Sequence, residues 1–243
     1  MWIRHTSAGN VRGMLGSLLG LLAPPACLAC RRGGDIAPRD VLCRDCRLAL
    51  PWLGPDLCRR CALPAPCGTR CPARDLAFAG AWAVVAYAGP VPALVAGLKE
   101  RGALAVARLM AAQLAALAAP GQWAGEGAAL VPVPADPLRR RRRGVDHAAR
   151  LAGELAPRCG LAVAPVLGRA VSRAGRQAGA GRAARLADGR LPVAVRSGAA
   201  VPPVAILVDD VHTTGATLHA CAQALRAAGA RDVRTVAYAR TST

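Results

Sequence analysis

The cysteines of this chain gather near its beginning in closely spaced pairs. Of the ten cysteines, eight fall between residues 27 and 71. Two thiolates on a tight turn can hold one metal ion, and a second pair a short loop later completes a tetrahedral site. The pattern therefore predicts two structural Zn²⁺ sites. The first comprises Cys27, Cys30, Cys43 and Cys46, and the second comprises Cys58, Cys61, Cys67 and Cys71.

Spacing alone leaves the grouping of these ligands open. A cross-braced arrangement and a set of disulfides are the alternatives. Closed four-thiolate sites have no open position for water, so zinc here would stabilise the fold and would not catalyse. Zinc-bound thiolates favour a reducing, cytoplasmic location. Cys159 and Cys221 lie outside the pairs and are expected to be small core residues.

A second pattern lies at residues 206–218, which read ILVDDVHTTGATL. Three apolar residues lead into Asp209 and Asp210, and a turn rich in Thr and Gly precedes a helix-like stretch. Amides at a helix N-terminus bind phosphate, and glycine lets the backbone come close. Neighbouring carboxylates can accept hydrogen bonds from a sugar diol and hold Mg²⁺. We therefore predict a ribose-5-phosphate pocket, the alternative being a capped turn without a ligand. Its residues are Asp209, Asp210, Thr213, Thr214, Gly215, Ala216 and Thr217.

The elements around this pattern alternate between strand-like and helix-like stretches. Strands are expected at 77–87, 128–134, 163–167, 191–195, 204–210 and 233–239, and helices at 91–102, 103–119, 145–156 and 215–229. This alternation predicts an α/β domain with a parallel sheet flanked by helices and a ligand at the carboxyl ends of the strands. Residues 169–190 are rich in Arg, Gly and Ala and predict a mobile loop. The expected domains are an N-terminal helix (1–23), a cysteine module (24–75) and the α/β domain (76–243).

The first residues resemble the apolar core of a signal peptide, but other features argue against one. Pro24 and Pro25 stand where small residues would be needed before Cys27, and cleavage there would remove a metal ligand. The apolar run is also shorter than the ~20 residues of a transmembrane helix. Leucines at helical spacing predict an N-terminal helix and no membrane insertion. These are Leu15, Leu18, Leu19 and Leu22.

The net charge of +18 comes almost entirely from arginine, because Lys99 is the only lysine. Such a charge attracts phosphates and nucleic acids, although biased composition on a solvated surface would also produce it. The chain has only four Trp, two Tyr and one Phe, so few side chains could stack on bases.

Residues 206–218 resemble the motif that binds phosphoribosyl pyrophosphate (PRPP) in type I phosphoribosyltransferases. Together with the cysteine pairs, residues 20–243 resemble the ComF family, in which a double zinc ribbon precedes a phosphoribosyltransferase-like domain. The resemblance implies PRPP or a related nucleotide as ligand, with Mg²⁺. It implies that Asp209 and Asp210 form the catalytic pair facing the ribose hydroxyls and that the following loop holds the 5-phosphate. His212 falls where the family pattern is loose and is expected to be a loop residue.

Residues 131–152 resemble the family segment of strand, Arg-rich turn and Arg-Gly pair. The resemblance implies that Val133, Pro134, Arg143 and Gly144 approach the pyrophosphate. Five successive arginines, 139–143, precede Gly144; a solvated turn is the alternative to a phosphate role for them. The family continues with Phe-Asn-Gln, whereas this chain has Val145, Asp146 and His147. The role of the family's Asn-Gln pair is therefore not carried over to Asp146 and His147.

Two further stretches resemble the family. Residues 173–186 resemble a basic hood over the active site. Its polar side chains are Arg173, Arg176, Gln177, Arg182 and Arg185, of which Arg176 and Arg182 are candidate phosphate contacts. Residues 87–102 resemble the stretch that ends in a Leu-Lys pair, which makes Lys99 a further candidate for a phosphate contact.

Two functions fit these patterns. The first is transfer of a phosphoribosyl group from PRPP to an acceptor that the sequence does not identify. The second is a competence-type binding protein for single-stranded DNA and DNA-processing partners, with the PRPP pocket as a regulatory site. The charge and the cysteine module support the second, but the scarcity of aromatic residues argues against strong strand binding. We therefore expect a PRPP-binding, phosphoribosyltransferase-like protein, with the competence-type binding protein as the alternative.

Overall fold

The computed structural model describes residues 26–33, 36–37, 40–100, 104–117, 125–136, 144–169 and 193–242. The expected N-terminal helix lies outside these residues, as do nearly all of the 169–190 loop and the arginine run 139–143. Among the candidate phosphate contacts, Arg143, Arg176 and Arg182 also lie outside the described residues.

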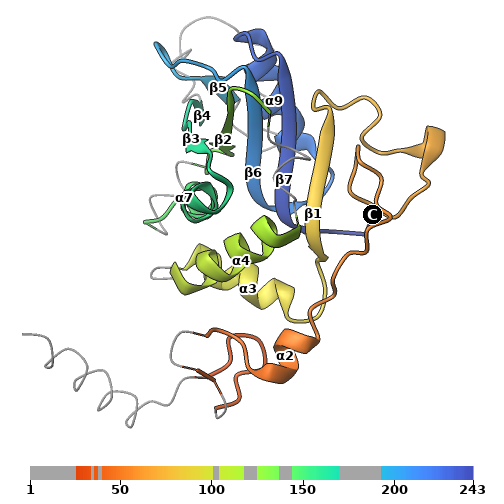
Figure 1. Ribbon diagram of the computed structural model, residues 1–243, viewed down its shortest axis with the longest axis vertical. Helices are drawn as coiled ribbons and strands as arrows, with labels where there is room; N and C mark the ends of the chain where they lie inside the picture. Colours follow the sequence, from red (N-terminus) through yellow and green to blue (C-terminus); the bar gives the residue numbers. More distant parts are fainter. Residues whose placement is uncertain are drawn as a thin grey trace, which may run out of the picture.

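The centre of the molecule is a five-stranded parallel sheet with strand order β1-β7-β6-β2-β3 (Figure 1). Its strands are β1 (Gly80–Ala86), β2 (Ala128–Pro132), β3 (Ala162–Val163), β6 (Val204–His212) and β7 (Asp232–Arg240). The central strands β6 and β7 are largely buried apolar runs, as expected for parallel strands that are covered on both faces. The predicted parallel α/β sheet is therefore confirmed.

Within the described ranges, four long helices cover this sheet. They are α3 (Val91–Lys99), α4 (Leu104–Leu117), α7 (His147–Cys159) and α9 (Ala216–Ala227). The first three pack in one core cluster with β1, β2 and β6, whereas α9 packs in a second cluster that includes residues of the second cysteine group. The side chain of Asp146 begins α7 by accepting a hydrogen bond from the Ala149 amide at 3.1 Å. No helix within the described ranges combines the length and apolar character needed to cross a bilayer.

The structure differs from the sequence prediction around residues 163–167. Instead of one strand, the chain forms β3 in the main sheet and then β4 (Leu167–Arg169), which pairs antiparallel with β5 (Val193–Val195) in a separate two-stranded sheet. Pro165 lies between β3 and β4 and has no amide to continue the ladder. The predicted strand at 191–195 therefore joins β4 and not the parallel sheet.

The cysteine module contains α2 (Arg44–Leu48) and a short 3₁₀ turn, η1 (Gly68–Arg70), and it runs along the edge of β1. The Leu53 amide donates to the Val84 carbonyl at 3.0 Å, and the Ala86 amide donates to the Pro51 carbonyl at 2.9 Å. Further along the strand, the Ala81 amide donates to the Arg59 carbonyl at 2.8 Å. The module thereby supplies hydrogen bonds to a strand edge that would otherwise be open, and Figure 1 shows it beside β1.

Candidate functional site

The eight paired cysteines form two groups of four. Within each group the sulfur atoms lie within 4.8 Å of one another, and the groups are the sequential ones, residues 27–46 and 58–71. The Sγ–Sγ distance is 3.8 Å for Cys30 and Cys43 and 3.9 Å for Cys58 and Cys71. Four sulfurs at about 2.3 Å from one Zn²⁺ stand about 3.8 Å apart, whereas a disulfide needs about 2.05 Å. The spacing is consistent with two structural zinc sites.

Backbone amides around Cys27 favour its thiolate form, which is the form that binds metal. Burial by itself would raise the pKa of Cys27, but backbone hydrogen bonds around Cys30 and Cys43 outweigh it and lower the pKa to about 6. The Cys43 amide donates to Cys27 Sγ at 3.4 Å. The turn that carries Cys27 is therefore preorganised to bind a cation.

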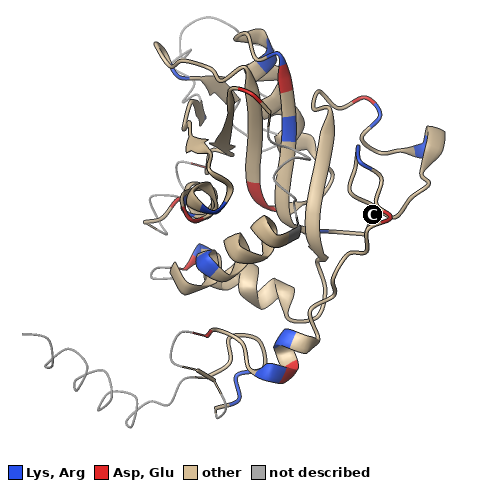
Figure 2. Ribbon diagram, viewed as in Figure 1, with Lys and Arg blue, Asp and Glu red and all other residues tan. Residues whose placement is uncertain are grey.

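The two acids lie within the last part of β6, which continues beyond them to His212. The carboxylate of Asp210 is 5% exposed, and its Oδ2 lies 2.7 Å from Nζ of Lys99 at the end of α3. The same oxygen lies 3.9 Å from Nε2 of His147. Asp209 Oδ1 accepts a hydrogen bond from the Asp210 amide at 2.9 Å. The acid pair is thus set between α3, the start of α7 and the sheet, and Figure 2 shows acidic colour near the carboxyl end of β6.

The electrostatics of this pair favour a positive ligand. Burial raises the pKa of Asp209 well above the usual range of a carboxyl group, and the charge of Asp210 raises it further. The ligand atoms of His147, Asp209 and Asp210 lie within 4.8 Å of one another. Carboxylate oxygens suit Mg²⁺, and the imidazole nitrogen also suits transition metals. The donor set therefore fits a divalent cation, with the Lys99 ammonium as a competing charge on Asp210.

A hollow of about 210 Å³ brings these groups together with other parts of the chain. Its lining includes the acid pair, Lys99, His147 and Thr217 from the first turn of α9. Val133 and Pro134, which follow β2, also line it. The hollow lies at the carboxyl ends of β2 and β6, where parallel sheets bind their ligands.

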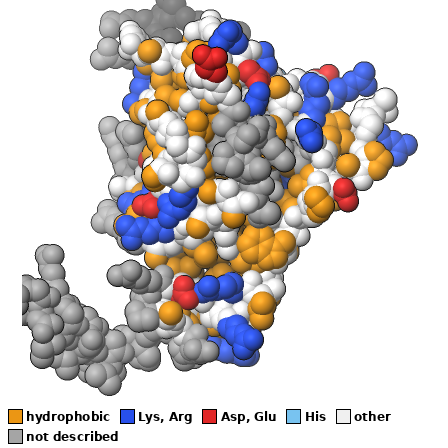
Figure 3. All heavy atoms as spheres, in the orientation of Figure 1, with side chains coloured by type: hydrophobic (Ala, Val, Ile, Leu, Met, Phe, Trp, Pro, Cys, Tyr) orange, Lys and Arg blue, Asp and Glu red, His pale blue; other side chains and the backbone are white. Residues whose placement is uncertain are grey.

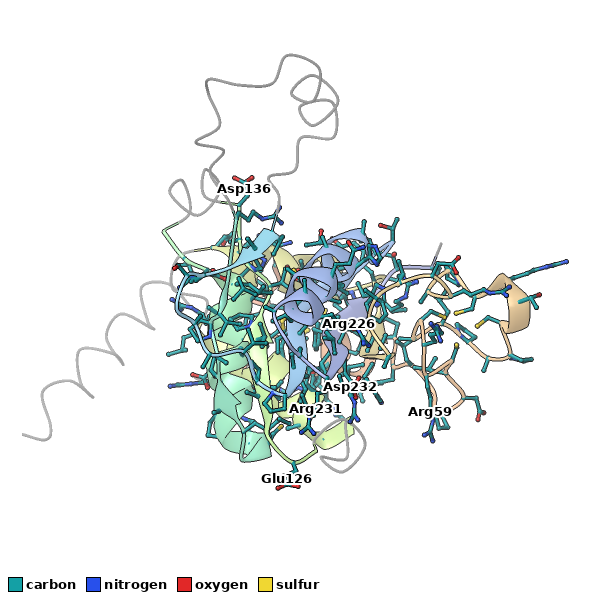
Figure 4. The ribbon with its side chains drawn as sticks, turned by 90° about the horizontal axis from the view of Figure 1, so that it is seen from above. Arg59, Glu126, Asp136, Arg226, Arg231 and Asp232 are labelled. Carbon is teal, nitrogen blue, oxygen red and sulfur yellow. The ribbon has the colours of Figure 1, made fainter. Side chains whose placement is uncertain are left out.

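Figure 4 shows a residue that precedes β2 and a residue that follows it. Asp136, which follows β2 and lines the hollow, is at one end of the view, and Glu126, which precedes β2, is at the other. Arg231 and Asp232 at the start of β7 lie toward the Glu126 side.

The Thr- and Gly-rich turn begins α9 as predicted. Gly215 has φ +80°, and a Cβ there would come within 2.9 Å of both His212 Nε2 and Leu76 Cδ1, so only glycine fits without strain. Thr214 Oγ1 accepts from the Ala216 amide at a long 3.4 Å. Among the predicted loop residues, Thr217 lines the hollow; Thr213, Thr214 and Ala216 are exposed and stand outside its described lining.

His212 differs from the expectation of a loop residue. It is the last residue of β6, it is 1% exposed, and its ring meets that of Phe78 edge-on at 5.8 Å between centroids. Burial, followed by the charge of Arg240, lowers the pKa of His212 to about 4. The imidazole is therefore neutral at physiological pH. The strand extends this far because the β6–β7 ladder continues to the pair His212 and Arg240.

Five lining residues of the hollow were not among the sequence candidates: Ala135, Asp136, Val145, His147 and Arg169. His147 was noticed only as a departure from the family pattern, although its place at the start of a helix after β2 could have indicated it. Arg169 was assigned to the 169–190 loop, but it ends β4, and its Nε donates to the Pro134 carbonyl at 3.0 Å. Gly144 adopts a φ of +72° and is not among the lining residues of the hollow.

The fold and the cysteine clusters define a double zinc ribbon joined to a parallel α/β domain consistent with the phosphoribosyltransferase fold. The family model of the double zinc ribbon domain matches residues 18–74. The competence protein ComFC of Streptococcus pneumoniae (strain ATCC BAA-255 / R6) is 42% identical over 50 residues, which cover 21% of this chain and 23% of ComFC. This chain is therefore similar to ComFC over a short segment, which spans about a quarter of that relative's length.

Proposed function

We propose that this protein binds PRPP, together with a divalent cation, in the hollow at the carboxyl ends of β2 and β6. The observation that carries the proposal is that Asp209, Asp210 and Thr217 line one hollow of about 210 Å³. Acids beside a helix N-terminus at the end of a parallel strand are suited to a sugar that carries a phosphate.

We match each part of PRPP with one side of the hollow on the basis of its chemistry. The carboxylates of Asp209 and Asp210 accept hydrogen bonds from the ribose diol, and the N-terminus of α9 receives the 5-phosphate. The backbone at Val133 and Pro134 and the cation of Arg169 lie on the side that would receive the pyrophosphate. A divalent ion, when bound, would neutralise charge on the phosphate oxygens. The displacement of Lys99 from Asp210 toward a phosphate would then open the acid pair to the ligand.

Transfer would follow from the same arrangement. The bond between the anomeric carbon and the pyrophosphate oxygen breaks, a bond from that carbon to the acceptor forms, and pyrophosphate leaves with the electron pair. Positioning and electrostatic stabilisation would supply the catalysis. Release of pyrophosphate from PRPP, measured with a panel of nucleobases, tests this step separately from binding.

Calorimetric titration of PRPP in the presence of Mg²⁺ tests the binding site. Asp209→Asn combined with Asp210→Asn should weaken binding by roughly a hundredfold or more, because two carboxylates that accept hydrogen bonds and hold the cation are lost. Asp232→Asn is the matched control, since Asp232 pairs with Arg234 at the start of β7. Both variants should retain two zinc ions per chain. Unchanged PRPP affinity in the double variant would show that the site is elsewhere.

A second candidate function is binding of single-stranded DNA, as the competence context of ComFC suggests. The observation in its favour is that Trp52 and Tyr87 are 47% and 38% exposed, so both could stack on bases. Trp52 pairs with Val85, two residues before Tyr87, which places both aromatics at the same edge of the sheet. Figure 3 shows Lys and Arg side chains at several separate places on the face in view. This function would be supported by binding of single-stranded DNA that depends steeply on salt and that weakens in Trp52→Ala, without release of pyrophosphate from PRPP.

A further inference from the structure

Arg240 connects the second cysteine group to the start of the 213–217 loop, the segment proposed to hold the 5-phosphate. It is the last residue of β7 and is 2% exposed. Its Nε donates to the carbonyl of Cys61 at 2.8 Å. On the other side, its Nη1 donates to the carbonyls of His212 at 3.0 Å and Thr213 at 2.5 Å. One guanidinium thus bridges a knuckle of the second group and the residues that lead into Gly215. In Figure 1 the C-terminus lies beside the orange part of the chain that contains the second cysteine group, in agreement with these contacts.

The charge of Arg240 also points to the second cysteine group. No carboxylate of the described residues forms an ion pair with Arg240. A buried charge is costly unless an opposite charge lies close to it. Four thiolates around one Zn²⁺ carry a net charge of −2, and Cys61 belongs to such a group. The cysteine group and the guanidinium are therefore suited to stabilise each other.

The segment that follows the second cysteine group also packs against the 213–217 loop and α9. Leu76 approaches Gly215, as the close contact of its Cδ1 with an added Cβ indicates. The Ala77 amide donates to Nδ1 of His219 at 2.9 Å, and Nε of Arg226 donates to the Ala77 carbonyl at 2.6 Å. Both partners of Ala77 belong to α9. The second group is thus attached to both ends of the loop, at β6 and at α9.

The first cysteine group has different neighbours. Leu28, between Cys27 and Cys30, packs on α3, where a Cβ at Gly97 would lie 2.6 Å from its Cδ2. Cys27 is buried in the cluster that contains α3 and α4, whereas Cys61 and Cys71 are buried in the cluster that contains α9. The two groups therefore act on opposite faces of the sheet, and the first provides an internal control for the second.

We propose that Arg240 is a positioning residue that makes the shape of the 213–217 loop depend on the metal-bound fold of the second cysteine group and not of the first. As far as the ligand is concerned, the inference rests on the proposed function, because PRPP affinity would then depend on the second group. Arg240 would act through backbone carbonyls and would not touch the ligand.

The first experiment compares two conservative variants on the same strand. Arg240→Lys keeps the charge, but a single ammonium cannot reach Cys61 and the 212–213 carbonyls together. Arg234→Lys is the matched control, because the guanidinium of Arg234 pairs with Asp232 on the same strand. Arg240→Lys should retain two zinc ions and lose about tenfold in PRPP affinity, within the usual size of coupling between sites. Equal affinities in the two variants would overturn the proposal.

The second experiment needs no PRPP and decides the matter even if Arg240→Lys does not fold. Amide hydrogen exchange at residues 213–217 is followed in Cys67→Ser, which disrupts the second group, and in Cys30→Ser, which disrupts the first. Exchange in this loop should become faster in Cys67→Ser only, while α4 stays protected. Equal effects of the two variants, an unchanged loop, or loss of protection throughout the α/β domain would each contradict a local link. Absence of PRPP binding by the native chain would instead refute the proposed function alone.

Discussion

His212 should make the stability of this protein fall in mild acid. Its pKa is lowered from 6.5 to about 4, chiefly because the ring is buried and secondly because Arg240 is near. Since the pKa is lower in the folded protein, the stabilisation is complete above pH 6.5 and is lost as the pH falls toward 4. By proton linkage the loss is about 2 kcal/mol at pH 5 and approaches about 3 kcal/mol below pH 4.

The variant His212→Leu removes this titration with a side chain of similar size. Nδ1 of His212 has no hydrogen-bond partner among the described residues, so the apolar replacement leaves no bonded partner of that atom behind. Urea unfolding at pH 7, 6, 5 and 4 gives the free energy of unfolding of both proteins. The native protein should lose about 2 kcal/mol more than the variant between pH 7 and pH 5. Parallel pH curves would refute the argument that His212 is buried in the neutral form.

Three further predictions concern the same region. Asp209→Asn should raise the free energy of unfolding at pH 7 while it weakens PRPP binding, because the raised pKa of Asp209 means that its charged form opposes folding. A lower thermal midpoint of the variant would contradict this. Gly215→Ala should destabilise the protein by about 1–3 kcal/mol, because φ is +80° and the Cβ would meet His212 and Leu76; urea unfolding with Gly153→Ala as control tests it. Lys99→Met should weaken PRPP binding and raise the affinity for Mg²⁺ alone, because an ammonium 2.7 Å from Asp210 is removed. Calorimetric titration measures both affinities. Weaker Mg²⁺ binding by the variant would show that Lys99 and Mg²⁺ do not compete for Asp210.

The features that the sequence predicted well are local ones. The spacing of the cysteine pairs predicted two metal sites but left a cross-braced grouping open, and the structure groups the pairs in sequence order. The long helices and the central strands follow from apolar periodicity and from Pro and Gly at their ends. The acid pair lies near the end of a buried strand because the run before it is continuously apolar.

The features that could not be predicted depend on distant parts of the chain. Lys99 ends a helix early in the α/β domain, and only the folded sheet brings it to Asp210. Arg240 carries a charge at the end of a strand, which in a sequence indicates a surface position, yet backbone carbonyls of two other segments bury it. The break at Pro165 and the pairing of β4 with β5 likewise depend on where the chain returns after residue 192.

The location of the ligand site is tested most directly by amide hydrogen exchange of the native protein with and without PRPP and Mg²⁺. Protection should increase at residues 207–218 and 131–136, where the acid pair, the start of α9 and the segment after β2 meet in one hollow. The cysteine module should show little change of its own. Unchanged exchange in both segments, or protection confined to other parts of the chain, would contradict a sugar-phosphate site at the end of β6.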